Sequence, residues 1–206
     1  MKFRSIAAVV FGIFFMFVAS VRADDDERGT QEFSVQGTGD FTKDSTSNGV
    51  HQHSTNSGGF LLSYRYHFNS WFSADVSYGR DRETQRNTAF GSVLSVQSNV
   101  HQATAAGVVN LPWRPARLNP YVLAGTGALA FAPTQAKGAT VLGAGGQSKA
   151  TFLYGGGVDY DFVKHFSLRM EYRGFVYGRP DFGVIALRTG AVTNTAQPSA
   201  GVVFRF

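Results

Sequence analysis

The chain has 206 residues, no cysteine and a formal net charge of +5. The lack of cysteine excludes a disulfide framework and any thiolate metal site. Three of the basic residues lie in a leader that we expect to be removed, which leaves a charge of only +2. This small net charge predicts no nucleic-acid partner, and the length of the chain favours one domain.

The N-terminus has the pattern of a secretory signal peptide. Lys2 and Arg4 precede an apolar run over 6–19, and small or aliphatic residues at positions 21 and 23 suit a signal peptidase. The run is shorter than the ~20 residues of a membrane-spanning helix. We therefore divide the chain into a signal peptide (1–23), an acidic flexible tail (24–30) and a main domain (31–206).

The main domain alternates apolar and polar side chains with a period of two, which predicts half-buried β-strands. In chain order, eight segments carry this pattern: 33–41, 60–68, 72–79, 100–111, 121–131, 152–162, 166–173 and 200–206. Small residues leave the facing of 100–111 open. In 121–131 we expect Leu123 and Leu129 on the aromatic face.

The connections between these segments alternate strictly between short and long. Three are short, with Asn69-Ser70 predicted as a two-residue hairpin turn: 69–70, 112–119 and 163–165. The long ones are polar loops: 42–57, 80–99, 132–149 and 178–195. Transmembrane β-barrels have this asymmetry, with short periplasmic turns and longer external loops. Both chain ends then fall on the periplasmic side.

Alternation alone does not separate an outward-apolar membrane barrel from an inward-apolar soluble barrel such as a lipocalin. The polar faces carry charges of both signs, which suit a narrow lumen: Arg65, Asp75, Asp159, Asp161, Arg169, Glu171, Arg173 and Arg205. All but Asp161 and Arg205 form the lumen charge network that we predict. Aromatics gather near the short turns as a predicted membrane-interface girdle: Phe68, Trp71, Phe72, Trp113, Tyr121, Phe162 and Phe166. These features favour a transmembrane antiparallel up-and-down β-barrel.

The strand order, the short turns, the segment 119–125 (NPYVLAG) and the aromatic terminus resemble the OmpA/OmpX-type family of small outer-membrane β-barrels. In such barrels an alternating last strand that ends on an aromatic residue looks like an assembly signal, carried here by Val202, Phe204 and Phe206. The resemblance implies export, chaperoned transit of the periplasm and insertion by the barrel-assembly machinery into the bacterial outer membrane. The resemblance also implies outer-membrane lipid and lipopolysaccharide as partners of the protein, and we expect a monomer.

Two motifs are candidate sites of chemistry. His165 and Ser167 have the His-x-Ser spacing of lipid A deacylases, and residues i and i+2 share a strand face. They lie beside a periplasmic turn, however, whereas lipid A occupies the outer leaflet. His51 and His53 could share a metal ion, but no third ligand is identifiable. We therefore expect no catalytic residues, no metal site and no cofactor.

The family resemblance implies no single activity. We expect a non-enzymatic scaffold that contributes to envelope integrity or to surface interaction through its loops. The alternatives are a narrow passive channel for small or apolar solutes, a lipid A-modifying enzyme and a soluble lipocalin-like binder. Charges along the predicted lumen disfavour an open pore, and the aromatic C-terminus disfavours the soluble barrel.

Overall fold

The computed structural model describes residues 30–42, 45–47, 50–54, 57–89, 92–113, 115–133, 146–178 and 192–206. The predicted signal peptide and nearly all of the acidic tail lie outside these ranges. The elements are β1 (Gln31–Thr42), β2 (Ser45–Ser47), β3 (Val50–Ser54), β4 (Ser57–His67), β5 (Phe72–Ala89), β6 (Ser92–Asn110), the 3₁₀ turn η1 (Pro115–Arg117), β7 (Leu118–Pro133), β8 (Gln147–Val163), β9 (Phe166–Gly178) and β10 (Val192–Arg205). Within the described ranges, no helix is long and apolar enough to span a membrane.

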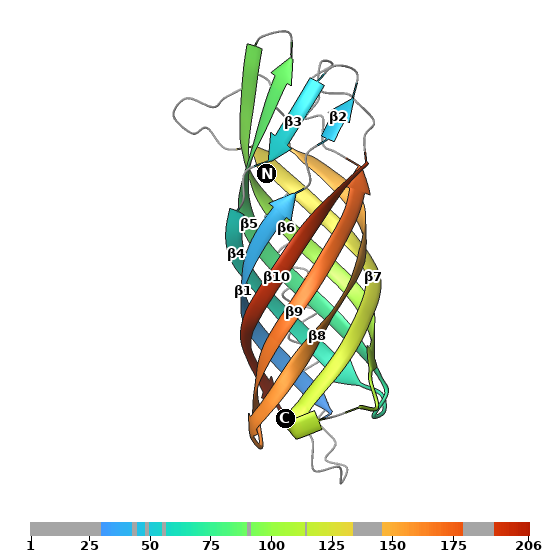
Figure 1. Ribbon diagram of the computed structural model, residues 1–206. Helices are drawn as coiled ribbons and strands as arrows, with labels where there is room; N and C mark the ends of the chain where they lie inside the picture. Colours follow the sequence, from blue (N-terminus) through green and yellow to red (C-terminus); the bar gives the residue numbers. More distant parts are fainter. Residues whose placement is uncertain are drawn as a thin grey trace.

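Eight of the strands form a closed antiparallel barrel (Figure 1). Each strand pairs with the next along the chain in the order β1, β4, β5, β6, β7, β8, β9 and β10, and β10 returns to β1. Phe33, for example, pairs with Tyr64 on β4 and with Phe204 on β10. Closure satisfies the backbone hydrogen bonds of every barrel strand, which a lipid environment requires. The predicted eight-stranded barrel is confirmed.

Two predicted loops contain strands instead. The range 42–57 includes β2 and β3, and β3 pairs with the outer end of β5 through contacts such as His51 with Thr88. The range 80–99 continues β5 and β6 as one hairpin, paired as far as Ala89 with Ser92. In Figure 1 these strands stand above the barrel. The regular apolar alternation of the sequence does not extend through these ranges, whereas the backbone ladder continues. The prediction of loops was therefore wrong in both ranges.

The opposite end of the barrel carries three short connections, 68–71, 111–117 and 164–165. The first has four residues, not the two predicted, because the Asn69 side chain caps the turn. Its Oδ1 accepts hydrogen bonds from the backbone N–H groups of Trp71 (2.9 Å) and Phe72 (2.8 Å). The Phe206 N–H also donates to the Gln31 carbonyl at 3.0 Å, so the chain's last residue lies at this turn end.

Facing differs around the wall of the barrel. Alternate positions of β4 and β9 place charges inside and large apolar side chains outside, as predicted. On β7 the large side chains Tyr121, Leu123, Leu129 and Phe131 are buried inside, whereas the small residues between them are outside. Leu123 and Leu129 therefore share the aromatic face of β7, as expected, and this face points into the barrel. On β6, whose facing was open, Val108 is among the inward residues.

Candidate functional site

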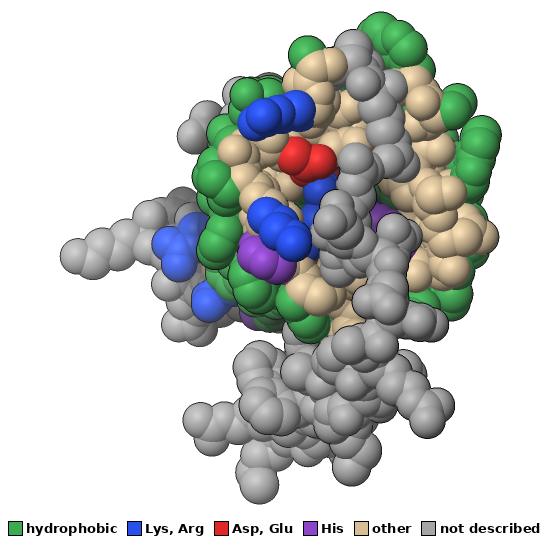
Figure 2. Space-filling model, turned by 90° about the horizontal axis from the view of Figure 1, so that it is seen from below, with side chains coloured by type: hydrophobic (Ala, Val, Ile, Leu, Met, Phe, Trp, Pro, Cys, Tyr) green, Lys and Arg blue, Asp and Glu red, His purple; other side chains and the backbone are tan. Residues whose placement is uncertain are grey.

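Nine charged side chains meet inside the barrel toward the turn end. We call this group the lumen charge cluster, and it consists of Glu32, Arg65, Asp75, Asp159, Asp161, Arg169, Glu171, Arg173 and Arg205. It includes all six residues of the predicted network. Seen from below, Figure 2 shows charged side chains gathered inside a rim of hydrophobic ones. Arg65, Arg169 and Arg173 are each only 1% exposed, so their charges depend on protein partners.

The layer nearest the turns centres on Glu32 of β1. Its Oε1 accepts from Arg205 Nε at 2.6 Å, and its Oε2 accepts from Arg169 Nη2 at 2.8 Å. Arg169 also binds Asp159 through two parallel contacts of 2.7 Å, from Nε and from Nη2. Arg205 pairs with Asp161 as well. Such bidentate, charge-assisted bonds are among the stronger hydrogen bonds in proteins, so this layer ties β1, β8, β9 and β10 together.

The next layer is a ring of alternating charge. Arg65 Nε contacts Asp75 Oδ2 at 3.3 Å, and Arg65 Nη2 contacts Glu171 Oε2 at 3.4 Å. Arg173 pairs with the same two carboxylates, with Asp75 Oδ1 at 3.3 Å and with Glu171 Oε1 through its Nε. Each carboxylate therefore has two guanidinium partners and each guanidinium has two carboxylates. This arrangement offsets the loss of water around four buried charges.

Tyr121 lies at the centre of the cluster. The Arg65 guanidinium lies 4.3 Å from the ring centroid and that of Arg169 lies 5.3 Å from it, both within cation–π range. The Tyr121 hydroxyl donates to Glu171 Oε2 at 2.6 Å. A Cβ added at Gly157 would come within 2.5 Å of the Tyr121 hydroxyl, so the ring needs a glycine beside it.

Tyr121 was therefore wrongly assigned to the aromatic girdle. The side chain is only 2% exposed, on the inward face of β7. The large apolar residues of this strand fill the part of the lumen opposite the charged strands, and sequence alternation alone does not reveal that inversion. The other six girdle residues are exposed around the turn end: Phe68, Trp71, Phe72, Trp113, Phe162 and Phe166.

A Ser-His-Glu arrangement that the sequence analysis missed lies at the rim of the cluster. His67 Nε2 lies 2.9 Å from Glu32 Oε1, and His67 Nδ1 lies 2.7 Å from Ser73 Oγ. The residues resemble a catalytic triad in type, but Ser73 is fully buried and its oxygen also accepts from Asn110 at 3.3 Å. A nucleophile needs access to its substrate, so this contact acts as a structural tie. Strand alternation was the sequence signal that could have revealed this contact, because His67 on β4 and Ser73 on β5 both fall at inward positions.

The His-x-Ser motif at 165 and 167 does not form a pair. His165 Nδ1 lies 3.1 Å from the Arg205 carbonyl, whereas the Ser167 hydroxyl donates to Asp161 Oδ1 at 2.6 Å. The side chains of His51 and His53 lie outside the described residues. Elsewhere in the described chain, no three His, Asp or Glu side chains form a group that could hold a metal ion.

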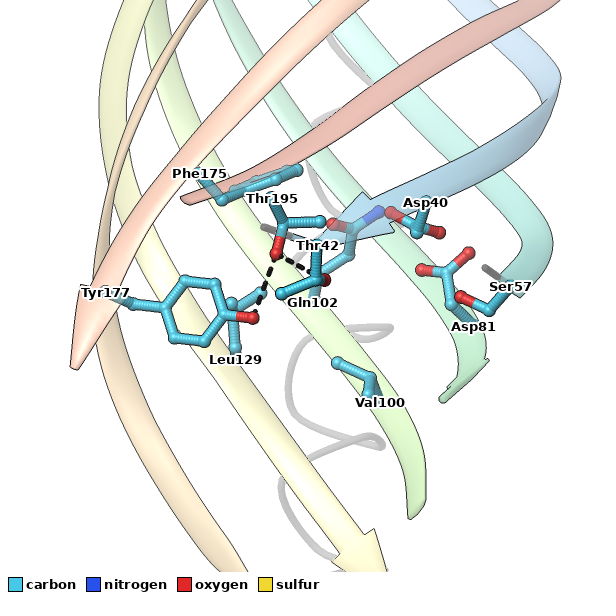
Figure 3. Close-up of a pocket in the computed structure, with 10 residues that line it drawn as sticks. All are labelled: Asp40, Thr42, Ser57, Asp81, Val100, Gln102, Leu129, Phe175, Tyr177 and Thr195. Atoms are coloured by element: carbon cyan, nitrogen blue, oxygen red, sulfur yellow. Dashed lines mark hydrogen bonds between the residues drawn. The ribbon is translucent and has the colours of Figure 1, made fainter. Parts of the chain in front are cut away.

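At the loop end the lumen holds a partly open cavity of about 30 Å³ (Figure 3). One side of its lining is polar, with Asp40, Asp81 and Gln102, and the other includes Phe175 and Tyr177. Thr195 links the lining through hydroxyl contacts of 2.8 Å to Thr42 and 2.9 Å to Tyr177. The cavity is large enough for solvent but is bounded by packed side chains.

The last strand closes the barrel and presents an aromatic edge at the turn end. Val202 and Phe204 are exposed on the outer face, opposite buried Val203. The Phe204 ring lies 5.2 Å from the Phe166 ring and 5.6 Å from the Phe206 ring, measured between centroids. The residues predicted as an assembly signal thus form one outward aromatic surface with β9.

The comparisons with known proteins agree with this geometry. A family model described as outer membrane protein beta-barrel domain matches residues 9–206. Similar solved structures include the outer membrane protein OprG of Pseudomonas aeruginosa, with 13% identity, a TM-score of 0.64 and coverage of 88% of this chain and 99% of that one. Neisserial surface protein A has 19% identity, a TM-score of 0.57 and coverage of 84% and 97%. The N-terminal β-barrel domain of Pseudomonas aeruginosa OprF has 17% identity, a TM-score of 0.51 and coverage of 87% and 100%.

A search of curated proteins gave no match. The structural identities are low and establish the fold alone, whereas the family model spans nearly the whole chain. The chain belongs to the outer membrane protein beta-barrel family and is an eight-stranded barrel of the bacterial outer membrane.

Proposed function

We propose that this protein is a non-enzymatic scaffold whose barrel is closed to ions and whose loop end serves envelope integrity or surface interaction. The lumen charge cluster is the observation that carries the proposal. Its ion pairs connect six of the eight barrel strands, and Tyr121 from β7 lies between two of its arginines. An ion crossing the lumen would have to separate buried pairs whose partners are then left uncompensated.

A second layer supports closure on the loop side of the cluster. Leu61, Leu153 and Phe175 are at most 2% exposed. Gln197 from β10 accepts a hydrogen bond from Gln102 of β6 at 3.2 Å, which joins two non-adjacent strands across the interior. Side chains nearly fill an eight-stranded interior, and this layer adds apolar bulk to the charged one.

The loop end supports the surface part of the proposal. The pairing of β6 with β7 ends at Ser98 with Pro133, whereas the pairing of β5 with β6 continues farther from the barrel. With β3 and β2, the strands β5 and β6 form a four-stranded sheet outside the barrel. A barrel anchored in lipid holds this sheet away from the membrane, where its backbone can contact molecules at the cell surface.

The proposal includes the route of assembly. The leader over 1–23 would direct export, and Val202, Phe204 and Phe206 would be read by the barrel-assembly machinery after chaperoned transit of the periplasm. Val202 and Phe204 are exposed on the outer face, so they are not needed to fill the barrel interior and are free to serve as a signal. The inserted protein would be a monomer surrounded by outer-membrane lipid and lipopolysaccharide.

A narrow passive channel is the second candidate. The open cavity at the loop end favours it, because a solute could enter the lumen there. The charge cluster blocks further passage unless its ion pairs rearrange. Catalysis has less support, since the described lumen offers no accessible nucleophile with a base.

Planar-bilayer conductance of the refolded mature protein tests the proposal. The expected result is no stable unitary conductance for the wild type. Arg173→Ala removes one of the two partners that Glu171 and Asp75 share and opens space, so it should give measurable conductance steps. The exposed turn variant Arg117→Ala should remain closed. Stable unitary steps in the wild type would refute closure and establish the channel.

A further inference from the structure

An exposed basic patch lies on the outer wall of the barrel toward the loop end. We define it as Arg80 and Arg82 on β5 with His101 on β6. Both arginines are exposed, on the face opposite the buried Gly79 and Asp81. Arg80 is in register with His101, and Arg82 is in register with Asn99. The two guanidinium groups therefore lie on one outward surface that two neighbouring strands form.

The protein supplies no counter-ion for this patch within its described part. Every carboxylate with a described side chain points into the lumen: Glu32, Asp40, Asp75, Asp81, Asp159, Asp161 and Glu171. Arg80 makes no hydrogen bond or ion pair with the described chain, and Arg82 makes only a 3.4 Å contact from its Nε to Asn99 Oδ1. Within the described residues, the anionic groups are therefore inside the barrel and these cations are outside it. The patch is thus available to an anion from the surroundings.

The base of the patch is ordered and amphipathic. The Tyr78 hydroxyl lies 2.7 Å from His101 Nδ1, which fixes the imidazole against β5. Phe60 on β4 is in register with Arg80, and its ring lies 6.5 Å from that of Tyr78. Tyr78 therefore lies one outward position nearer the turn end than Arg80, and Phe60 lies beside Arg80 on the neighbouring strand. This is the order of groups, aromatic then cationic, that a protein presents across a membrane–water interface.

The height of the patch agrees with that interface. A strand residue rises about 3.3 Å along the strand, and a tilt of about 40° reduces this to about 2.5 Å along the barrel axis. Arg82 is ten residues beyond Phe72, which belongs to the exposed aromatics of the turn end. The separation is therefore about 25 Å, the height of the apolar band of such barrels. Arg80 and Arg82 lie where the outer-leaflet headgroups begin.

We propose that the basic patch binds the phosphate group of a phosphorylated outer-leaflet lipid, with acyl chains packed below it against Phe60 and Tyr78. Guanidinium groups match phosphate oxygens through bidentate charge-assisted hydrogen bonds. The inference rests on the outer-membrane location and on strand facing, and it is independent of whether the lumen conducts.

The test is a native mass-spectrometry titration of the refolded mature protein in zwitterionic micelles. The probes are bisphosphorylated lipid A and its dephosphorylated form. The wild type should bind the phosphorylated lipid more tightly. Charge near a membrane surface contributes about 5-fold in binding affinity per arginine, so the preference should fall about 25-fold in R80Q/R82Q. R80K/R82K keeps the charge without the planar fork and should retain part of the preference.

The matched control is R117Q, which removes an exposed arginine at the opposite end and should leave the preference intact. Equal affinity of the wild type for the two lipids, or an unchanged preference in R80Q/R82Q, would overturn the proposal. Binding of inorganic phosphate alone as tightly as the bisphosphorylated lipid would reassign the patch to a free anion. Bilayer conductance of R80Q/R82Q should match the wild type, which separates this result from closure of the lumen.

Discussion

Removal of the Glu171 carboxylate is the sharpest perturbation of the lumen. Glu171 accepts from Arg65 at 3.4 Å, from Tyr121 at 2.6 Å and from Arg173. Glu171→Ala leaves both arginines with Asp75 as a shared partner. Breaking a buried pair from one side costs about 3–5 kcal/mol, and an unsatisfied hydroxyl costs about 1–3 kcal/mol. These contributions share partners and do not add, so we expect a loss of about 3–5 kcal/mol.

The assay is equilibrium unfolding in urea from lipid vesicles, followed by tryptophan fluorescence and by the gel mobility of unheated samples. Tyr121→Phe removes one hydrogen bond but keeps the ring between the arginines, so it should cost about 1–2 kcal/mol. Arg117→Ala, at an exposed turn position, serves as the control and should change the free energy of unfolding by less than about 0.5 kcal/mol. An unfolding midpoint for Glu171→Ala equal to that of the wild type would mean that water compensates the arginines, and the closed lumen would be refuted.

Two further predictions concern the outer surface. Deletion of Phe206 should reduce the folded outer-membrane fraction in cells far more than its burial energy of about 1.5–3 kcal/mol implies, whereas refolding in vitro should change little; normal assembly in cells would exclude its role as a signal. Met170 is 66% exposed on the outward face, about 10 Å along the axis from Phe166, so Met170→Arg should cost about 2–4 kcal/mol in vesicles. Val163→Arg, beside the turn, should cost about 0–1 kcal/mol, and equal costs at both positions would contradict the placement of Met170 near the bilayer midplane.

The strand pattern predicts the lumen charges well because facing follows parity. Arg169, Glu171 and Arg173 alternate with Leu168, Met170 and Tyr172, and an antiparallel wall with lipid outside permits only one orientation. Strand alternation does not predict which side chains each charged residue contacts. Arg169 contacts Glu32, which lies 137 residues away, through the stagger of strands around the barrel. Strand alternation predicts which residues point into the interior, whereas the closure and stagger of the barrel determine which of these residues contact each other.

The loop end was least predictable because the sequence there lacks the regular alternation of apolar and polar residues that marks the barrel strands. β5 and β6 nevertheless remain paired from Arg82 with Asn99 to Ala89 with Ser92. The backbone ladder continues where the sequence signal for a strand ends. A polar stretch between two barrel strands therefore reads equally well as a loop or as a continued hairpin.

The inversion on β7 follows from how a narrow lumen is filled. Charged side chains from the β1, β4, β5, β8, β9 and β10 wall reach across the barrel toward β6 and β7. A charge on those strands would need its own partner, whereas an aromatic ring can contact two guanidinium groups and still present a hydroxyl to a carboxylate. Tyr121 does both. Because inward and outward positions alternate along a strand, the smaller residues of β7 lie mostly on its outer face. The face of a strand that meets lipid therefore need not carry its largest side chains.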